Sequence, residues 1–174
     1  MEFSIKIVKK GSMLLEIGAK GFMDFINQII QEKAFIKMQK EITLDEEEKW
    51  LAKTAEELDK GKKIFVLALS GKRIVGNCQA YVGDGALAYN MNFGLAVSKN
   101  LRGQGLGRKL LLTAIEEGKK TFSPHKIMID YIGGNETAKH LYESIGFREV
   151  CRLKGFYHHY GEFRDKVTLE LAES

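Results

Sequence analysis

Cysteine is scarce in this chain: only Cys78 and Cys151 occur among 174 residues. They are far apart in sequence and each lies in an apolar stretch, so they cannot build a four-ligand zinc site. Two distant cysteines also exclude a disulfide scaffold, and a chain of this length buries enough surface to fold without one. We therefore expect two buried free thiols in a reducing compartment and no bound metal.

Long apolar runs are missing as well. No stretch approaches the roughly 18 consecutive apolar residues of a membrane-spanning helix. The first residues alternate like a strand and lack the charged and apolar blocks of a signal peptide. These absences predict a cytoplasmic protein without a membrane partner.

The net charge of the chain is small, but one short segment carries a local excess of positive charge. The chain has 27 Lys and Arg against 23 Asp and Glu, a net charge of +4. Residues 99–109 nevertheless contain Lys99, Arg102, Arg108 and Lys109 without a single acid. This cluster predicts a compact anion site. It is too small for a nucleic-acid groove, which needs a basic stripe with interleaved aromatic residues, so no nucleic-acid partner is expected.

The hydrophobic pattern predicts the order of the elements. Strands are expected at 3–8, 63–69, 73–82, 86–97, 126–131, 147–157 and 164–171, and helices at about 19–32, 43–61, 105–119 and 135–145. The order β-α-α-β-β-β-α-β-α-β-β has no repeat, no linker and a single proline, Pro124. It predicts one α/β domain over residues 1–174 around a mixed sheet, with a parallel crossover at 87–131.

A glycine-rich turn carries the chemistry. An apolar strand ends at Val97, a basic turn follows, and Gly103, Gly105 and Gly107 lead into a helix. Glycines let the backbone approach a ligand, and successive N–H groups at a helix start bind a phosphate or pyrophosphate. The Lys-Ser or Lys-Thr pair of a Walker loop is absent, and the glycine spacing differs from that of a dinucleotide fingerprint. A nucleotide ligand is therefore disfavoured, although preference for ATP would restore it.

Two motifs together resemble the GCN5-related N-acetyltransferase (GNAT) superfamily. The first is Arg102-x-x-Gly105-x-Gly107, which is similar to the acyl-CoA signature of the superfamily. The second is residues 135–147, which begin with Asn-Glu-Thr-Ala and end with Leu-Tyr-x-x-x-Gly-Phe. The resemblance implies a mixed, mostly antiparallel sheet of about seven strands flanked by about four helices. It also implies direct transfer of an acetyl group from acetyl-CoA to a primary amine through a ternary complex, without a metal.

The resemblance further implies which residues hold the cofactor. The backbone N–H groups of a six-residue turn would bind the pyrophosphate of coenzyme A: Gly103, Gln104, Gly105, Leu106, Gly107 and Arg108. Arg102 would add charge beside them. The backbone of Leu95 and Val97 would pair with the pantetheine, and the N–H near Leu95 would polarise the thioester carbonyl. Asn135 would bond the pantetheine.

The acid and the base of the reaction have unequal support. The resemblance places Tyr142 at the thioester sulfur, where its hydroxyl would protonate the departing thiolate. Many relatives carry a glutamate on the strand before the glycine loop, but residues 86–97 contain no carboxylate. Relatives that acetylate ribosomal-protein termini use a residue that corresponds to Asp130. Asp130 could instead cap a backbone N–H, and a water chain could replace a dedicated base.

The acceptor amine is open between two classes. A protein or peptide N-terminus predicts an open groove, whereas a small amine or polyamine predicts a closed acidic pocket that uses Glu46, Glu47 or Asp84. A coenzyme A-binding sensor without turnover is the alternative function. His158 and His159 are adjacent on a strand and point to opposite faces, so they are poorly placed to share a metal. The last hairpin presents an edge that could pair in a homodimer.

Overall fold

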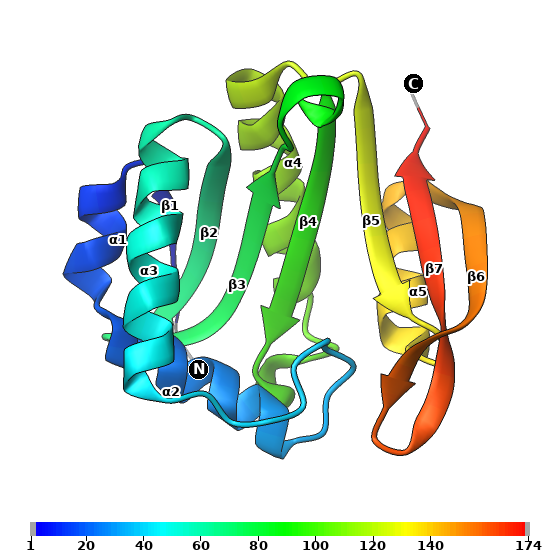
Figure 1. Ribbon diagram of the computed structural model, residues 1–174, viewed down its shortest axis with the longest axis horizontal. Helices are drawn as coiled ribbons and strands as arrows, with labels where there is room; N and C mark the ends of the chain where they lie inside the picture. Colours follow the sequence, from blue (N-terminus) through cyan, green and yellow to red (C-terminus); the bar gives the residue numbers. More distant parts are fainter. Residues whose placement is uncertain (1–2, 173–174) are drawn as a thin grey trace.

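The computed structural model describes residues 3–172. The strands are β1 (Ser4–Val8), β2 (Lys63–Ser70), β3 (Arg73–Tyr81), β4 (Asn90–Val97), β5 (Lys126–Ile132), β6 (Phe147–His159) and β7 (Glu162–Leu171). The helices are α1 (Gly11–Ile17), α2 (Ala19–Gln31), α3 (Leu44–Asp59), α4 (Leu106–Phe122) and α5 (Glu136–Ile145). The strands form one sheet in the order β1-β2-β3-β4-β5-β7-β6 (Figure 1). Only β4 and β5 pair in parallel, so the predicted mixed, mostly antiparallel sheet of seven strands is confirmed.

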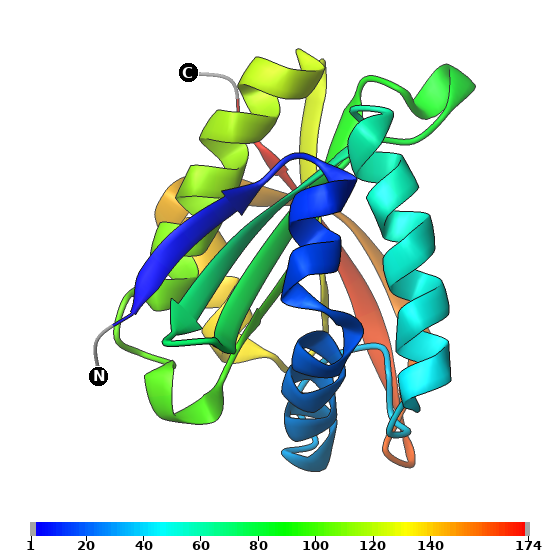
Figure 2. The ribbon, with the colours of Figure 1, turned by 90° about the vertical axis from the view of Figure 1, so that its left-hand side faces the viewer.

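Helices cover both faces of the sheet. Helices α1, α2 and α3 lie on one face, and α4 and α5 lie on the other (Figures 1 and 2). Each face has its own core. Phe22, Phe25 and Phe65 fill the core beneath α2 and α3, whereas Leu110 and Phe147 belong to the core on the opposite face. This division follows from strands whose alternate side chains point to opposite faces.

Local sequence signals set the ends of two helices. At the start of α3 the Thr43 hydroxyl accepts a hydrogen bond from the Glu46 N–H at 3.3 Å, and the Glu46 carboxylate accepts one from the Thr43 N–H at 2.8 Å. This is the predicted capping box. Helix α4 runs three residues beyond its predicted end and stops at Ser123, whose φ is 45°. Pro124 follows and cannot continue a helix.

The structure corrects three expectations. Helix α1 was not predicted, because seven residues give too short a periodic pattern. Strand β4 begins at Asn90 instead of residue 86, since Gly85–Leu87 forms a 3-10 turn. Cys78 is buried as expected, but Cys151 is exposed, so the expectation of two buried thiols is wrong for Cys151. Cys151 lies on β6, which is the strand at one edge of the sheet and is exposed along most of its length.

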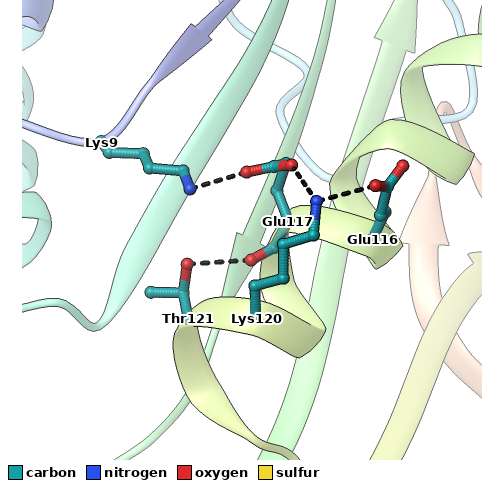
Figure 3. A network of polar contacts seen from close by, with 5 residues as sticks. All are labelled: Lys9, Glu116, Glu117, Lys120 and Thr121. Carbon is teal, nitrogen blue, oxygen red and sulfur yellow. Dashed lines mark hydrogen bonds and ion pairs between the residues drawn. The ribbon is translucent and has the colours of Figure 1, made fainter.

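A polar network joins β1 to the back of α4, away from the cavity described below (Figure 3). Lys9 Nζ lies 2.6 Å from the Glu117 carboxylate, and Lys120 Nζ lies 2.7 Å from Glu116 and 3.0 Å from Glu117. The hydrogen bonds from Lys9 and Lys120 lower the pKa of Glu117. The lysines are largely exposed, so salt screens these pairs and their contribution to stability is small.

The feature that positions a site is the short pairing of β4 with β5. Their parallel register contains only Asn90↔Lys126 and Met91↔Ile127. Beyond Met91 the two strands separate, while β4 stays paired with β3 along its length. A V-shaped gap therefore opens inside the sheet toward the glycine-rich turn.

Within residues 3–172, none of the helices has the length and apolarity to cross a membrane.

Candidate active site

The gap leads into one large cavity of about 1110 Å³. Small-molecule sites typically enclose roughly 300–1,000 Å³, so the cavity has room for more than one ligand. It is lined by the glycine-rich turn, by β4, β5 and α5 on one side, and by α2, α3 and β3 on the other. The first side is the cofactor half predicted from the sequence.

The backbone of β4 presents hydrogen-bonding groups to the gap. The N–H of Ser98 donates to Val75 on β3 at 3.0 Å. Because backbone groups point to alternate edges along a strand, Val97 and Leu95 turn theirs away from β3 and toward β5. Arg102 Nε donates a hydrogen bond to the Val97 carbonyl oxygen at 2.8 Å, which agrees with a Val97 carbonyl that points away from β3. Leu95 thus has the position expected of a partner for an extended ligand.

The glycine-rich turn has the conformation of an anion cradle. Gly103 and Gly105 have φ of 72° and 81°, in the left-handed region, and a Cβ on either would project into open space. A side chain at these positions would strain the backbone and fill the cradle. Gly107 packs closely, because its Cβ would lie 3.4 Å from Leu141. These features fit a pyrophosphate. Leu106 is only 2% exposed, and neither Leu106 nor Gln104 lines the cavity, so the structure does not place these two predicted cofactor residues at it.

The polar side chains of the turn have protein partners that hold its shape. Arg102 also reaches Glu32 at the end of α2, with Nη2 2.5 Å from the carboxylate. Arg108 Nη1 donates to Ser144 Oγ on α5 at 2.8 Å, and Gln104 Nε2 donates to the Asn100 carbonyl at 2.7 Å. Arg102 and Arg108 therefore bring charge to the turn while they tie it to α2 and α5.

Asn135 begins α5 at the mouth of the gap. Its Oδ1 accepts a hydrogen bond from the Ala138 N–H at 3.1 Å and caps the helix. Its Nδ2 has no hydrogen-bond partner among residues 3–172 and lines the cavity. The side chain can thus cap α5 and donate to a ligand at once.

Tyr142 is a buried residue of α5 that lines the cavity. It is 5% exposed and lies between Tyr131 and Phe147, with ring centroids 6.2 and 6.1 Å away. Its hydroxyl makes no hydrogen bond within the described part of the chain, and the residue lines the cavity. Burial, with smaller effects of Cys78 and Asp130, raises the pKa of Tyr142 well above its ordinary value. The hydroxyl therefore stays protonated at all ordinary pH values.

Asp130 lines the same half but has two partners. Its Oδ1 accepts a hydrogen bond from Thr168 Oγ1 at 2.7 Å, and its Oδ2 lies 3.0 Å from Lys166 Nζ. The side chain is 25% exposed. The carboxylate is thus half-buried and held by two partners, one of which it would have to exchange in order to take a proton from an amine.

The second half of the cavity lies between the sheet and the first helices. Its floor is a row of polar side chains on β3 and β4, Asn77, Gln79 and Asn92, that share the face covered by α2 and α3. Its roof includes Glu47 of α3, which is 6% exposed and lines the cavity. Burial raises the pKa of Glu47 to about 7, and no charged group contributes to that shift.

A strap, defined here as residues 33–42, crosses from α2 to α3 beside the end of β4 (Figure 1). It is bound to the β6–β7 hairpin. Gln39 Nε2 donates to the His158 carbonyl at 2.7 Å, and the Tyr160 N–H donates to Gln39 Oε1 at 2.8 Å. The Phe35 ring stacks on His159 with centroids 5.3 Å apart. The strap and the hairpin thus meet beside the cavity.

Comparison with known proteins decides the family. The model of the acetyltransferase (GNAT) family matches residues 26–147, well over half of the chain. The chain belongs to the GNAT family of N-acetyltransferases. A search of curated protein sequences found no significant match.

Solved structures share the fold of this GNAT chain at low sequence identity. A ribosomal-protein-alanine N-acetyltransferase from Brucella melitensis has a TM-score of 0.78 at 20% identity, with 98% of each chain covered. A phosphinothricin acetyltransferase from Sinorhizobium meliloti, in complex with acetyl-CoA, has a TM-score of 0.79 at 15% identity, with 100% of this chain and 91% of that chain covered. A GNAT acetyltransferase from Streptococcus pneumoniae has a TM-score of 0.80 at 21% identity, with 97% and 98% covered.

Of the three residues expected in an acidic acceptor pocket of the GNAT chain, Glu46 and Glu47 line the large cavity and Asp84 does not. Glu46 is exposed and caps Thr43, whereas Asp84 forms an ion pair with Lys62 outside the large cavity. Only Glu47 is both buried and directed into the cavity. Among residues 3–172, no three His, Cys, Asp or Glu side chains gather closely enough to hold a metal ion.

The polar floor of the GNAT cavity was missed by sequence reasoning. The signal was present, because β3 reads Asn77-Cys78-Gln79-Ala80-Tyr81, a strict alternation of polar and apolar residues. A strand in the middle of a sheet covered by helices on both faces should be apolar throughout. Polar side chains on one face of such a strand indicate a cavity instead of a packed helix.

The pKa of Glu47 makes stability of this GNAT domain depend on pH. The pKa is about 7 in the folded state against an ordinary value of 4.5, so the unfolded chain ionises first as pH rises. We expect the free energy of unfolding to fall between pH 4.5 and 7. Glu47→Gln should remove about 2 kcal/mol of that fall. This is less than the whole pKa shift converted to free energy, because the carboxylate lies at the cavity and solvent screens it. Urea unfolding at pH 4.5 and pH 8 measures this. An equal fall in wild type and Glu47→Gln would contradict it.

Proposed function

We propose that this chain is an acetyl-CoA-dependent N-acetyltransferase that moves an acetyl group directly to a primary amine in a ternary complex. The observation that carries the proposal is the separation of β4 from β5 beyond Met91, with the glycine-rich turn at its open end and Tyr142 lining it. Acetyl-CoA supplies the acetyl group as a reactive thioester. The catalytic domain would extend over residues 1–174, of which 1–2 and 173–174 lie outside the described residues.

The residues of the gap fit the parts of the cofactor in order. The backbone N–H groups from Gly103 to Arg108 would hold the pyrophosphate, with charge from Arg102 and Arg108. Leu95 and Val97 would offer backbone groups along β4, and the Leu95 N–H would polarise the thioester carbonyl. The Nδ2 of Asn135 would donate from the other side of the gap. The position of the two substrates in one cavity would supply most of the rate enhancement.

Two side chains would move protons. Tyr142 would donate its hydroxyl proton to the departing thiolate, and its raised pKa supports this role because the hydroxyl stays protonated until charge develops beside it. Asp130 would accept the proton that the attacking amine loses. Its effect on the pKa of Tyr142 supports a place near the reacting groups. Its bonds to Thr168 and Lys166 favour a water that relays the proton over direct contact with the amine.

Calorimetry with acetyl-CoA and a thiol-release assay with an amine panel test this function. The panel contains 2-phenylethylamine, spermidine, free amino acids, aminoglycosides and short peptides with free N-termini. We expect micromolar binding of acetyl-CoA and faster thiol release with one class of amine. Binding without turnover for any amine would favour a coenzyme A sensor. Failure to bind acetyl-CoA, or tighter binding of ATP, would overturn the proposal.

Two further sequence predictions accompany it. The homodimer through the last hairpin stays a prediction, supported by the exposed apolar side chains of Val150, Leu153, Phe156 and Phe163 on β6 and β7. Sedimentation of the full chain would test it. The cytoplasmic location also stays a prediction.

A further inference from the structure

Glu47 is a buried carboxylate without a partner. It is 6% exposed, and its carboxylate makes no hydrogen bond and no ion pair with residues 3–172. A buried ionisable group in this state is costly unless a ligand or a neighbour compensates it. The carboxylate faces the large cavity, so the missing partner can come from the cavity. A carboxylate in this position selects a cation.

The surroundings of Glu47 describe the rest of that ligand. Trp50 lies one turn further along α3, and the Phe22 ring lies 5.9 Å from the Trp50 ring. Phe25 and Ile29 continue this apolar wall along α2. The floor opposite offers the amides of Asn77 and Gln79, which have no side-chain hydrogen bonds within the described residues. The space suits an apolar or aromatic body with room for a polar substituent.

The other charges of this half limit the ligand to one positive charge. The titratable groups here are Glu32, Lys33, Lys37, Glu46, Glu47, Tyr81 and Arg102. Glu32 is paired with Arg102, and the Glu46 carboxylate bonds to Thr43. Lys33 and Lys37 form no ion pair within residues 3–172 and lie over Tyr160 and Tyr157 at the strap. Two lysines without an ion pair would repel a ligand with several positive charges, and one unpaired carboxylate can neutralise only one of those charges. This half of the cavity therefore disfavours a polyamine.

We propose that the half of the cavity between α2, α3 and the polar face of β3–β4 is the acceptor site, and that Glu47 binds the ammonium group of the acceptor. The acceptor class is a small primary amine with a single positive charge and a compact apolar or aromatic body. The contacts between strap and hairpin disfavour a peptide N-terminus, because they close the groove that a peptide would occupy. This inference rests on the proposed function and names its second substrate.

Binding of an ammonium at Glu47 would release a proton. Near pH 6 the Glu47 carboxyl is mostly protonated, because its pKa is about 7. A cation beside it favours the ionised form, so the carboxyl gives its proton to the buffer as the amine binds. The O–H bond of Glu47 breaks, the proton leaves, and an ion pair remains. The bound ammonium must still give one proton to the water relay proposed at Asp130 before its nitrogen can attack the thioester. A neutral ligand of the same shape releases no proton.

The only tryptophan of the chain gives a direct readout of this site. Trp50 lines the cavity, so its fluorescence reports occupancy without turnover. The protein is titrated with 2-phenylethylamine, and with 2-phenylethanol as the uncharged match, in the presence of saturating coenzyme A that carries no acetyl group. The variants are Glu47→Gln and, as the matched control, Glu48→Gln, whose side chain is exposed and outside the cavity. Calorimetry at pH 6 in two buffers of different ionisation enthalpy counts the protons released.

We expect wild type and Glu48→Gln to bind the amine at least tenfold more tightly than the alcohol, with release of close to one proton. We expect Glu47→Gln to lose this preference and the proton release while it binds coenzyme A normally. Equal amine binding in Glu47→Gln, or tighter binding of spermidine or of an alanine peptide than of the amine, would overturn the inference. Failure of the proposed function is distinguishable, because either coenzyme A would not bind or no amine would accelerate thiol release, whereas the Trp50 titration measures amine binding without turnover.

Discussion

Tyr142→Phe is expected to lower kcat about 100- to 1000-fold, the usual size of a general-acid contribution, with acetyl-CoA affinity changed less than twofold. The phenylalanine ring keeps the contacts with Tyr131 and Phe147, so the core around it persists. Only the hydroxyl is lost, and it has no protein partner within residues 3–172 that its removal would leave unsatisfied. The effect therefore falls on the chemical step and spares binding and folding.

Thiol-release kinetics and acetyl-CoA calorimetry measure this effect. Tyr131→Phe is the matched control, because Tyr131 belongs to the same aromatic cluster and its hydroxyl is influenced by Arg152 on β6. We expect its kcat to stay near that of wild type. If Tyr142→Phe kept kcat within fivefold of wild type, the leaving thiolate would need no proton from this residue. The pH profile adds a check, since the raised pKa of Tyr142 predicts no loss of kcat from this group up to at least its ordinary titration range.

Gly105→Val is expected to weaken acetyl-CoA binding at least 100-fold. Gly105 has a φ of 81°, is the N-cap of α4 and lines the cavity. A valine there would strain the backbone by about 2 kcal/mol and place its side chain in the space intended for the pyrophosphate. Because no atom lies within 4 Å of the added Cβ, the variant has no clash that would prevent folding.

Gly61→Val is the matched control for Gly105→Val, because it introduces the same backbone strain without placing a side chain at the cofactor site. Gly61 follows α3, has a φ of 68°, and likewise has nothing within 4 Å of an added Cβ, but it lies outside the cavity. We expect both variants to lose similar stability in urea and only Gly105→Val to lose acetyl-CoA affinity in calorimetry. Equal affinities for acetyl-CoA in the two variants would show that the cradle does not hold the cofactor.

The sequence determined the features that depend on near neighbours along the chain. Helix periodicity, strand alternation and the Thr43 capping box predicted the order of elements and four of the five helices. The glycine spacing predicted a glycine-rich turn between strand and helix, and the left-handed conformations found there at Gly103 and Gly105 are a local property of glycine. With the second motif, this turn identified the family before any three-dimensional information was used.

Only the tertiary structure decided which side chains the cavity retains for chemistry. Asp130 and Arg102 find partners on β7 and α2, far away in sequence, and no local pattern shows such pairs. Cys151 is exposed on a strand at the sheet edge, and Glu47 is buried on α3, which packs against α2 and β2. Burial and partnership are properties of contacts between distant segments. They decide which of several acidic residues keeps a free carboxylate at the cavity.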